Sequence, residues 1–327
     1  MTSVAHPTSD WYARAAGELA ATSDLQVAWA HTVAGDPELL ELIDRLPPEH
    51  RQPSLIFSVA TWCGAPAVAD PSWRQWVVAH WTEIEDAARI RRTQTNEVGR
   101  CIPLLVGLDR IAAADQRPIA LLELGAAAGL CLAVDRYRYR FDDGPALGDG
   151  DPLLTTTTTG TGAAPTQLPD IVWRRGVDLA PLDVTDADDV RWLEALLPLD
   201  RTERRARLLG AISAIRDDPP LVVAGDALDA LPELANAARA EAPDATLVIA
   251  ALGTLVYLPA AQRDAIVDAA RHLGAHLLTF EGARVLPGVA AAVQNLSAPH
   301  PTAFVLGVDG RPLAHAGPHG DRLSWLS

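Results

Sequence analysis

Lysine is absent from this chain of 327 residues, which also contains only three cysteines and one methionine. The cysteines, at 63, 101 and 131, are an odd and widely spaced set, which excludes a disulfide framework and a Cys-x-x-Cys zinc motif. The chain lacks a run of about eighteen apolar residues, so no transmembrane helix is expected. No basic segment followed by an apolar stretch stands near the start, so we expect no secretory signal and a cytoplasmic protein.

Positive charge is also in short supply. All 27 basic residues are arginines, and 42 acidic residues bring the formal net charge to −15. A surface of this sign repels phosphate groups, which argues against nucleic acids and anionic membranes as partners. Apolar residues make up 49% of the chain, which is typical of a globular protein with a core.

The first third of the chain carries apolar residues at helical spacing. The helices that this spacing predicts lie at 9–25, 37–46, 73–90 and 96–114. Pro103 predicts a kink or a late helix start in the last of them. The polar, proline-bearing break at 115–118 predicts a boundary between an N-terminal helical cap domain over 1–115 and a second domain over 116–327.

After this break, short apolar runs alternate with helical stretches. The predicted strands lie at 119–124, 171–177, 221–224, 246–251 and 276–280, and the predicted helices between them at 187–197, 203–215, 231–240 and 260–272. This alternation predicts a mostly parallel sheet covered on both faces. Residues 302–316, with Asp309-Gly310 at their centre, predict a terminal antiparallel hairpin with a tight turn.

Residues from about 137 to 170 interrupt the alternation, so we assign them to an insertion. Tyr137, Tyr139 and Phe141 alternate with arginines, which predicts an exposed strand. The threonine run at 155–159 stands between glycine-rich turns and predicts either an antiparallel strand or a low-complexity loop.

The strongest local signal is Leu-Glu-Leu-Gly-Ala-Ala-Ala-Gly-Leu at 122–130, where a buried strand runs into small residues and a predicted helix at 130–134. Small residues let the backbone approach a ligand closely, and a helix start offers free N–H groups. Leu130 stands where a dinucleotide fold needs its third glycine, so that pattern fails. The residues that follow the spacing typical of methyltransferases instead are Glu123, Gly125, Ala127 and Gly129. The alternative is a tight strand-to-helix packing turn.

Two further predicted strands end in an acidic residue. Asp178 stands where a carboxylate can accept hydrogen bonds from ribose hydroxyls, or it is a turn residue near Pro181. Asp226 stands where a carboxylate can accept from an adenine amine, with Ala227 beside the ring, or it caps the next helix. Because parallel strands end at one edge, we expect these carboxylates and Glu123 to converge.

Candidate substrate contacts come from two segments. The end of the fourth predicted strand contains no His, Asp or Glu, and Tyr257 is either a polar contact there or a packed aromatic. The polar run before the predicted boundary supplies Gln94, Asn96, Glu97 and Arg100. The alternative for this run is a helix junction with solvated charges. The histidine pairs 272/276 and 315/319 lack a third ligand, so no metal site is expected.

These segments together resemble an uncharacterised bacterial family, domain of unknown function 2332, over residues from about 11 to 325. The segments that carry the resemblance are Gln94–Val98, Glu123–Leu130, Asp135–Tyr137, Arg175–Asp178, Gly225–Ala227, Pro318–Gly320 and Trp325. That family is similar to class I S-adenosylmethionine-dependent methyltransferases. The resemblance implies a Rossmann-like α/β fold of the class I methyltransferase type, with a mostly parallel sheet, an antiparallel C-terminal hairpin and a preceding helical domain.

The chain departs from the family pattern at three places. Cys131 stands where the family favours asparagine, and the chain lacks the histidines that the family favours near Ala251 and near Thr61. If those polar side chains serve catalysis, this chain has lost or altered it.

The leading expectation is methyl transfer from S-adenosylmethionine to an unknown small molecule. The expected cofactor contacts are Glu123, Gly125, Ala127, Gly129, Asp178, Asp226 and Ala227, and the expected substrate contacts are Gln94, Asn96, Glu97, Arg100 and Tyr257. The alternative is a non-catalytic, methyltransferase-like protein for ligand binding or partner assembly. Leu130 disfavours a nicotinamide-dependent oxidoreductase. The sequence leaves the catalytic residues, the methyl acceptor and the oligomeric state open.

Overall fold

The computed structural model describes residues 7–20, 22–294 and 303–326, and the chain forms two compact units. Unit 1 comprises residues 1–95 and 185–206, and unit 2 comprises residues 96–184 and 207–327. The first division therefore falls after residue 95 rather than at the expected 115/116, because the helix over 101–115 packs on the sheet of unit 2. The segment 185–206 returns to unit 1 from the middle of the α/β sequence.

Unit 1 is helical in the part of it that the structure describes. Its helices are α1 (Pro7–Leu19), α2 (Asp24–Gly35), α3 (Pro37–Ile43), α4 (Pro53–Cys63), α5 (Pro71–Ala79), α6 (Trp81–Ile90) and α8 (Ala187–Ala195), with a short 3-10 helix η1 (Pro48–His50). Trp29 and Trp73 stack with ring centroids 4.9 Å apart, and Phe57 packs edge-on against both. Asp36 caps α3 and Asp70 caps α5. Each of these helices begins with a proline, which is tolerated there because the first N–H group of a helix has no intrahelical partner.

Two of the expected helices are divided in the structure. The stretch 9–25 ends as α1 at Leu19, and Ser23 then caps α2 by accepting from the N–H of Gln26 at 3.1 Å. The stretch 73–90 is divided at His80, which ends α5 and precedes α6. The spacing of apolar residues indicates which face of a helix is buried, but it does not reveal a helix cap inside a periodic stretch.

Unit 2 contains one mixed sheet of ten strands. The strands are β1 (Ile119–Leu124), β2 (Arg138–Phe141), β3 (Leu153–Thr159), β4 (Ile171–Asp178), β5 (Leu221–Ala224), β6 (Thr246–Leu252), β7 (His276–Gly282), β8 (Phe304–Val308), β9 (Arg311–Ala316) and β10 (Arg322–Trp325). Their order is β2-β3-β10-β9-β8-β7-β6-β1-β4-β5, with parallel pairing from β5 to β7 and antiparallel pairing from β7 to β10. The expected α/β fold, with a mostly parallel sheet and antiparallel C-terminal strands, is confirmed.

The hairpin of β8 and β9 turns at Asp309 and Gly310, whose φ values are 53° and 76°. Two consecutive positive φ angles are typical of a two-residue hairpin turn, which explains why Asp-Gly predicted it. The first residue of the expected hairpin, Thr302, lies outside the described residues.

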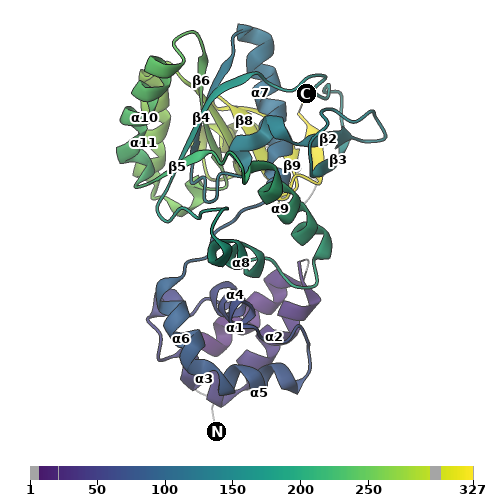
Figure 1. Cartoon of the computed structure of the whole chain (residues 1–327), viewed down its shortest axis with the longest axis vertical. Helices are drawn as coiled ribbons and strands as arrows, with labels where there is room; N and C mark the ends of the chain where they lie inside the picture. Colours follow the sequence, from purple (N-terminus) through teal and green to yellow (C-terminus); the bar gives the residue numbers. More distant parts are fainter. Residues whose placement is uncertain (1–6, 21, 295–302, 327) are drawn as a thin grey trace. The chain divides into compact units, whose positions relative to one another are not determined.

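Helices cover both faces of the sheet in unit 2. α10 (Ala227–Glu241), α11 (Ala260–His272) and α12 (Pro287–Val293) share one apolar core with alternate residues of β1, β6 and β7. α7 (Cys101–Asp115) packs on the other face, where Gly107 lies against Leu278 and Leu306. Figure 1 shows α10 and α11 side by side on the parallel half of the sheet. All six residues of β1 are buried, which explains its continuous apolar run.

The insertion adds strands to the far edge of the sheet. β3 contains the threonine run, so this run is a strand and not a loop. The expected antiparallel pairing is wrong, because β3 pairs in parallel with both β2 and β10. No helix among the described residues is both long and apolar enough to cross a bilayer.

Candidate functional site

Five parallel strands of unit 2 end at one edge and bring the expected carboxylates to it. Counted along the chain, the strands stand in the order third, second, first, fourth, fifth, and the chain changes direction between β1 and β6. Open α/β sheets bind ligands outside the carboxyl ends of the strands at such a switch point. Glu123 pairs with Gly176 in β4, and Asp178 pairs with Ala224 in β5, two residues before Asp226. Glu123, Asp178 and Asp226 therefore all lie at this edge.

The loop after β1 has the backbone of a close-approach turn. Gly125, Ala127 and Gly129 have φ angles of 70°, 50° and 73°, in the left-handed region that favours glycine. Ala127 is therefore strained where the related pattern has glycine. The peptide N–H groups of the loop are engaged within unit 2: those of Gly125 and Ala126 donate to Val177 O at 2.8 and 3.1 Å, and that of Gly129 donates to Ala126 O at 2.7 Å. The loop binds its own fold closely, as the packing-turn interpretation predicted.

The remaining two N–H groups of the loop are held by side chains. Ala127 donates to Oδ2 of Asp178 at 2.9 Å, and Ala128 donates to Oδ1 of Asn96 at 3.0 Å. Adjacent peptide groups of one loop thus join the end of β4 to the segment before α7. Asn96 belongs to unit 2 and lies beside the loop, while Gln94 belongs to unit 1.

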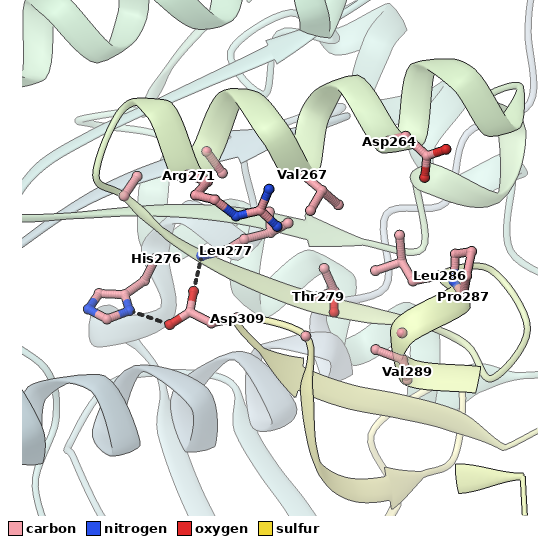
Figure 2. A pocket seen from close by; sticks show the side chains of 14 residues that line it. Asp264, Val267, Arg271, His276, Leu277, Thr279, Leu286, Pro287, Val289 and Asp309 are labelled. Carbon is pink, nitrogen blue, oxygen red and sulfur yellow. Dashed lines mark hydrogen bonds and ion pairs between the residues drawn. The ribbon is translucent and has the colours of Figure 1, made fainter. Parts of the chain in front are cut away.

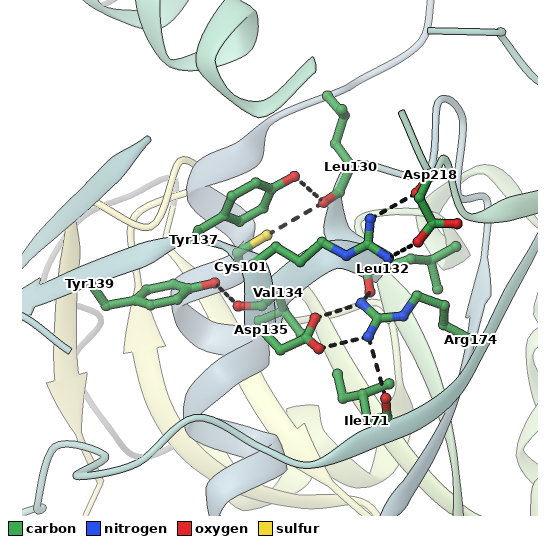
Figure 3. Close-up of polar contacts among 11 residues, drawn as sticks. Cys101, Leu130, Leu132, Val134, Asp135, Tyr137, Tyr139, Ile171, Arg174 and Asp218 are labelled. Carbon is green, nitrogen blue, oxygen red and sulfur yellow. Dashed lines mark hydrogen bonds and ion pairs between the residues drawn. The ribbon is translucent and has the colours of Figure 1, made fainter. Parts of the chain in front are cut away.

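The helix expected at 130–134 is a 3-10 helix, η3 (Cys131–Arg136). Figure 3 shows that side chains bind carbonyl groups in and just before this segment. The Tyr137 hydroxyl donates to Leu130 O at 2.8 Å, Arg174 Nη1 donates to Leu132 O at 2.9 Å, and the Tyr139 hydroxyl donates to Val134 O. A segment whose carbonyls are bound in this way does not need an i to i−4 ladder.

Asp178 is a turn residue whose carboxylate binds backbone N–H groups of two loops. Its Oδ1 accepts from Ala180 N–H at 2.9 Å, its Oδ2 accepts from Ala127 N–H, and its main-chain oxygen accepts from Gly225 N–H at 2.9 Å. Asp178 is half-buried, and the next residue, Leu179, is 76% exposed.

Asp226 is the N-cap of α10. Its Oδ1 accepts from Leu228 N–H at 2.8 Å and from Asp229 N–H at 3.4 Å, so the capping alternative describes this contact. Ala227, the first residue of the helix, is half-buried. A Cβ on Gly225 would meet nothing within 4 Å, so the backbone here borders open space.

Glu123 is 4% exposed and lies on the face of β1 opposite to the core that β1 shares with α10, α11 and α12. Its Oε2 has no hydrogen-bond partner. Burial raises the pKa of this carboxyl well above its ordinary value; nearby Cys131 and Asp178 add to the rise, and Arg100 opposes it. Burial therefore favours the protonated form of this side chain, in which it can donate a hydrogen bond.

The side chains of Thr254 and Arg100 fill space at the switch point between β1 and β6. Thr254 Oγ1 lies 2.4 Å from where a Cβ would stand on Gly125, so no larger residue fits there. Arg100, in the 3-10 helix η2 (Val98–Arg100), lies against Gly253 and donates to Leu252 O at the end of β6. Gly125 and Gly253 are thus required for packing at the ends of β1 and β6.

Glu281, at the end of β7, is a fourth strand-end acid to which the sequence analysis gave no role. It is 3% exposed, and its Oε1 accepts from the N–H groups of Thr254 and Leu255, each at 2.8 Å. Burial raises its pKa to about 7, against hydrogen bonds from the backbone and the charge of Arg100. Its Oε2 has no hydrogen-bond partner. The signal was present, because this strand, like β1 and β4, has an acidic residue at its end.

Glu97 is buried and makes polar contacts with segments far away in the sequence. Its Oε1 accepts from Gly99 N–H at 3.1 Å and lies 3.8 Å from Nη2 of Arg207. Its Oε2 lies 3.1 Å from Nδ1 of His319, in the turn between β9 and β10. The sequence analysis considered His319 only as half of a metal pair and missed Arg207, because nothing local links either residue to position 97.

Exposed apolar side chains border the same edge. The 3-10 helix η4 (Leu255–Tyr257) follows β6, and Val256 and Tyr257 in it are 51% and 77% exposed. The packed-aromatic alternative for Tyr257 is therefore wrong. Together with Leu179, these side chains offer apolar contact to a ligand at the strand ends.

No cluster of three or more His, Cys, Asp or Glu side chains with metal-binding geometry occurs among the residues that the structure describes. A further cavity of unit 2 has a volume of ≈ 540 Å³. Figure 2 shows residues that line it, among them His276, whose Nδ1 lies 2.7 Å from Asp309 Oδ2. The lining extends from His276, the first residue of β7, past Thr279 to residues 286–289, which follow this strand.

A family model described as "Uncharacterized protein conserved in bacteria (DUF2332)" matches residues 8–325. The match covers both units. No curated protein matches the chain.

Proposed function

Because the chain belongs to the DUF2332 family of uncharacterised bacterial proteins, we propose its function from the site. We infer that the protein binds S-adenosylmethionine at the carboxyl edge of the sheet and transfers its methyl group to a small molecule. The fold that this proposal assumes is the class I methyltransferase type. The order of the five parallel strands supports it. Beyond the parallel strands, β8, β9 and β10 continue the sheet as antiparallel neighbours.

The observation that carries the proposal is the position of Asp178. It ends the strand next to β1, and the N–H groups of Ala127 and Ala180 fix its carboxylate. In doubly wound folds an acid at this place binds ribose hydroxyls. The open space at Gly225 and the exposed side chain of Leu179 suit an adenosine group beside it.

The other residues at the edge have separate tasks in this proposal. Asp226 and Ala227 would border the adenine. Glu123, whose Oε2 has no hydrogen-bond partner, would lie near the methionine part of the cofactor. When bound, S-adenosylmethionine supplies an electrophilic methyl group. Asn96, Glu97, Arg100 and Tyr257 would orient the acceptor, because positioning alone contributes much of the rate of such transfers.

Calorimetry with S-adenosylmethionine, S-adenosylhomocysteine and NAD tests this proposal. We expect the first two to bind and Asp178→Asn to weaken them about tenfold or more, since a hydrogen bond to a charged group contributes about 1.5–3 kcal/mol. Asp309→Asn, in the β8–β9 turn, is the matched control and is expected to leave binding unchanged. Binding of NAD alone would exclude the methyltransferase proposal.

A second candidate is a non-catalytic protein that keeps the fold for ligand sensing or partner assembly. Two observations favour it. All N–H groups of the loop from Gly125 to Gly129 donate to acceptors within unit 2, and the carboxylate of Asp226 caps a helix. The same calorimetry separates the two, because the absence of binding by any of the three nucleotides supports this second candidate.

A further inference from the structure

The cavity of ≈ 540 Å³ is bordered by α11, β7, the start of α12 and the turn between β8 and β9 (Figure 2). All of its lining residues belong to unit 2. Its volume is in the range of small-molecule sites, about 300–1,000 Å³. Among the described residues that line it, none has a role in the proposed function. The cavity therefore offers space for a ligand of its own.

Apolar residues make up most of the lining. Four of them belong to the apolar core between the sheet and its helices: Ala270, Leu277, Leu286 and Val289. Gly288 and Gly310 also line the cavity, and a Cβ on either would meet nothing within 4 Å, so the small size of these residues leaves the space open. An apolar body that enters this space leaves water, which is favourable.

The charged groups at the cavity leave a negative charge without a partner. Nη1 of Arg271 donates to Oδ1 of Asp268 at 2.7 Å, which balances the positive charge of this lining residue. Nδ1 of His276 lies 2.7 Å from Oδ2 of Asp309, so the imidazole balances this carboxylate when it is protonated and leaves it negative when it is not. The carboxylate of Asp264, in α11, lines the cavity and has no ion pair or hydrogen bond to any residue that the structure describes. The charge that remains at the cavity is therefore negative.

The net charge of the whole chain has the same sign. It is −15, and the field of such a protein attracts cations and repels anions. A ligand that suits this cavity therefore combines an apolar body with a positive charge.

We propose that this cavity binds an organic cation with an apolar body, such as an alkylamine. The alkyl chain lies against Leu277, Leu286 and Val289, and the ammonium group lies next to the carboxylate of Asp264. An alkyl carboxylate of similar length fits the same space, but Asp264 and the net charge of the chain repel it. This inference goes beyond the proposed function and is independent of it, because it involves neither the strand-end acids nor S-adenosylmethionine.

Calorimetry at pH 7 with octylamine and octanoate tests the proposal, because the two probes have similar alkyl chains and opposite charges. We expect octylamine to bind about tenfold more tightly than octanoate. Asp264→Asn should weaken the binding of octylamine about threefold, which is the typical contribution of an exposed ion pair, and should not weaken that of octanoate. Glu233→Gln, an exposed change in α10 outside the cavity, is the matched control and should leave both affinities unchanged.

Gly288→Leu tests whether the cavity holds the alkyl chain. The new side chain has room, because a Cβ at this position meets nothing within 4 Å, and it takes up space that the ligand needs. Octylamine should therefore bind at least about tenfold more weakly, since much of its apolar surface then stays in water. Gly17→Leu, in α1, also places a Cβ where nothing lies within 4 Å, and this control should bind octylamine like the wild-type protein.

Methyl ¹H–¹³C NMR spectra of the wild-type protein decide the matter even if a variant fails to fold. Octylamine should shift the methyl signals of Val267, Leu277, Leu286 and Val289. Shifts confined to other methyl groups overturn the proposal, and so does octanoate binding that equals or exceeds the binding of octylamine. The absence of octylamine binding also overturns it, and is the result expected if a second copy of the chain occupies the cavity.

Discussion

Glu123 and Glu281 show what burial does to carboxyl groups at the ends of strands. Each has an oxygen without a hydrogen-bond partner, and for each, burial is the largest cause of a raised pKa. Arg100 is close enough to both to oppose the rise, yet it does not cancel it. A buried carboxyl that remains neutral costs less than an unpaired buried charge, so these residues bind the proton more tightly in the folded chain than in the unfolded one.

Glu281 gives a prediction about stability and pH. Its pKa rises from 4.5 to about 7 on folding, so its stabilising contribution is complete below pH 4.5 and is lost as the pH rises through about 7. Glu281→Gln keeps an acceptor for the N–H groups of Thr254 and Leu255 and removes the titration. At pH 8 we expect this variant to exceed the wild-type free energy of unfolding by up to about 3 kcal/mol.

Urea unfolding at several values of pH between 4.5 and 8 checks this expectation. The advantage of the variant should shrink as the pH falls, because protonated Glu281 and glutamine are both uncharged. Glu233→Gln, an exposed change in α10, is the control. Parallel curves for Glu281→Gln and the wild-type protein would refute the assignment.

The elements around the candidate site end and begin where side chains bind backbone groups. Tyrosine and arginine side chains take the carbonyls of η3, and the carboxylate of Asp226 takes the first N–H groups of α10. Arg174 also binds both oxygens of Asp135, which anchors η3 to β4. The ends of these elements are therefore bound by side chains within unit 2.

Asp226→Ala tests the cap of α10. The change leaves the N–H groups of Leu228 and Asp229 without their partner, so we expect a loss of about 1 kcal/mol in the free energy of unfolding. Asp226→Asn, which is also a good cap, should lose a few tenths at most. Thermal and denaturant unfolding measure both variants, and equal losses would show that the charge rather than the cap stabilises the helix.

The packing of α7 decides where the chain divides into its two units. This helix is continuous in sequence with the N-terminal helices, yet Gly107 lies against Leu278 of β7 and Leu306 of β8. Unit 1 in turn takes residues 185–206 from the middle of the α/β sequence. Each unit therefore depends on chain that a boundary at 115/116 would separate.

Gly107→Ala and Gly17→Ala form a matched pair at this scale. A Cβ at Gly107 would stand 2.4 Å from Leu278 Cδ1, so we expect overpacking to destabilise unit 2 by about 1–3 kcal/mol. A Cβ at Gly17, in α1, would meet nothing within 4 Å, so alanine should stabilise by about 0.5–1 kcal/mol.

Hydrogen exchange locates both effects. Gly107→Ala should speed exchange in α7, β7 and β8 and leave α1 to α6 unchanged. Faster exchange in α1 to α6 with an unchanged sheet would show that α7 belongs with the N-terminal helices instead.

The sequence by itself determined the features that depend on local pattern. Buried parallel strands read as continuous apolar runs, so all five were predicted, and Asp309-Gly310 predicted the tight turn because few residues accept two positive φ angles. The strand-end acids followed, since parallel strands end at one edge. The late start of α7 also followed, because Pro103 is tolerated in a first turn.

Only the tertiary structure decided the rest. The 3-10 form of η3, the parallel pairing of β3 and the packing of α7 depend on partners far away in the chain, which periodicity does not report. The approach of His319 to Glu97 depends on a backbone contact between Gly99 and Gly320 that no spacing in the sequence reveals. Local pattern fixes which face of an element is buried, and only the packed chain fixes what covers it.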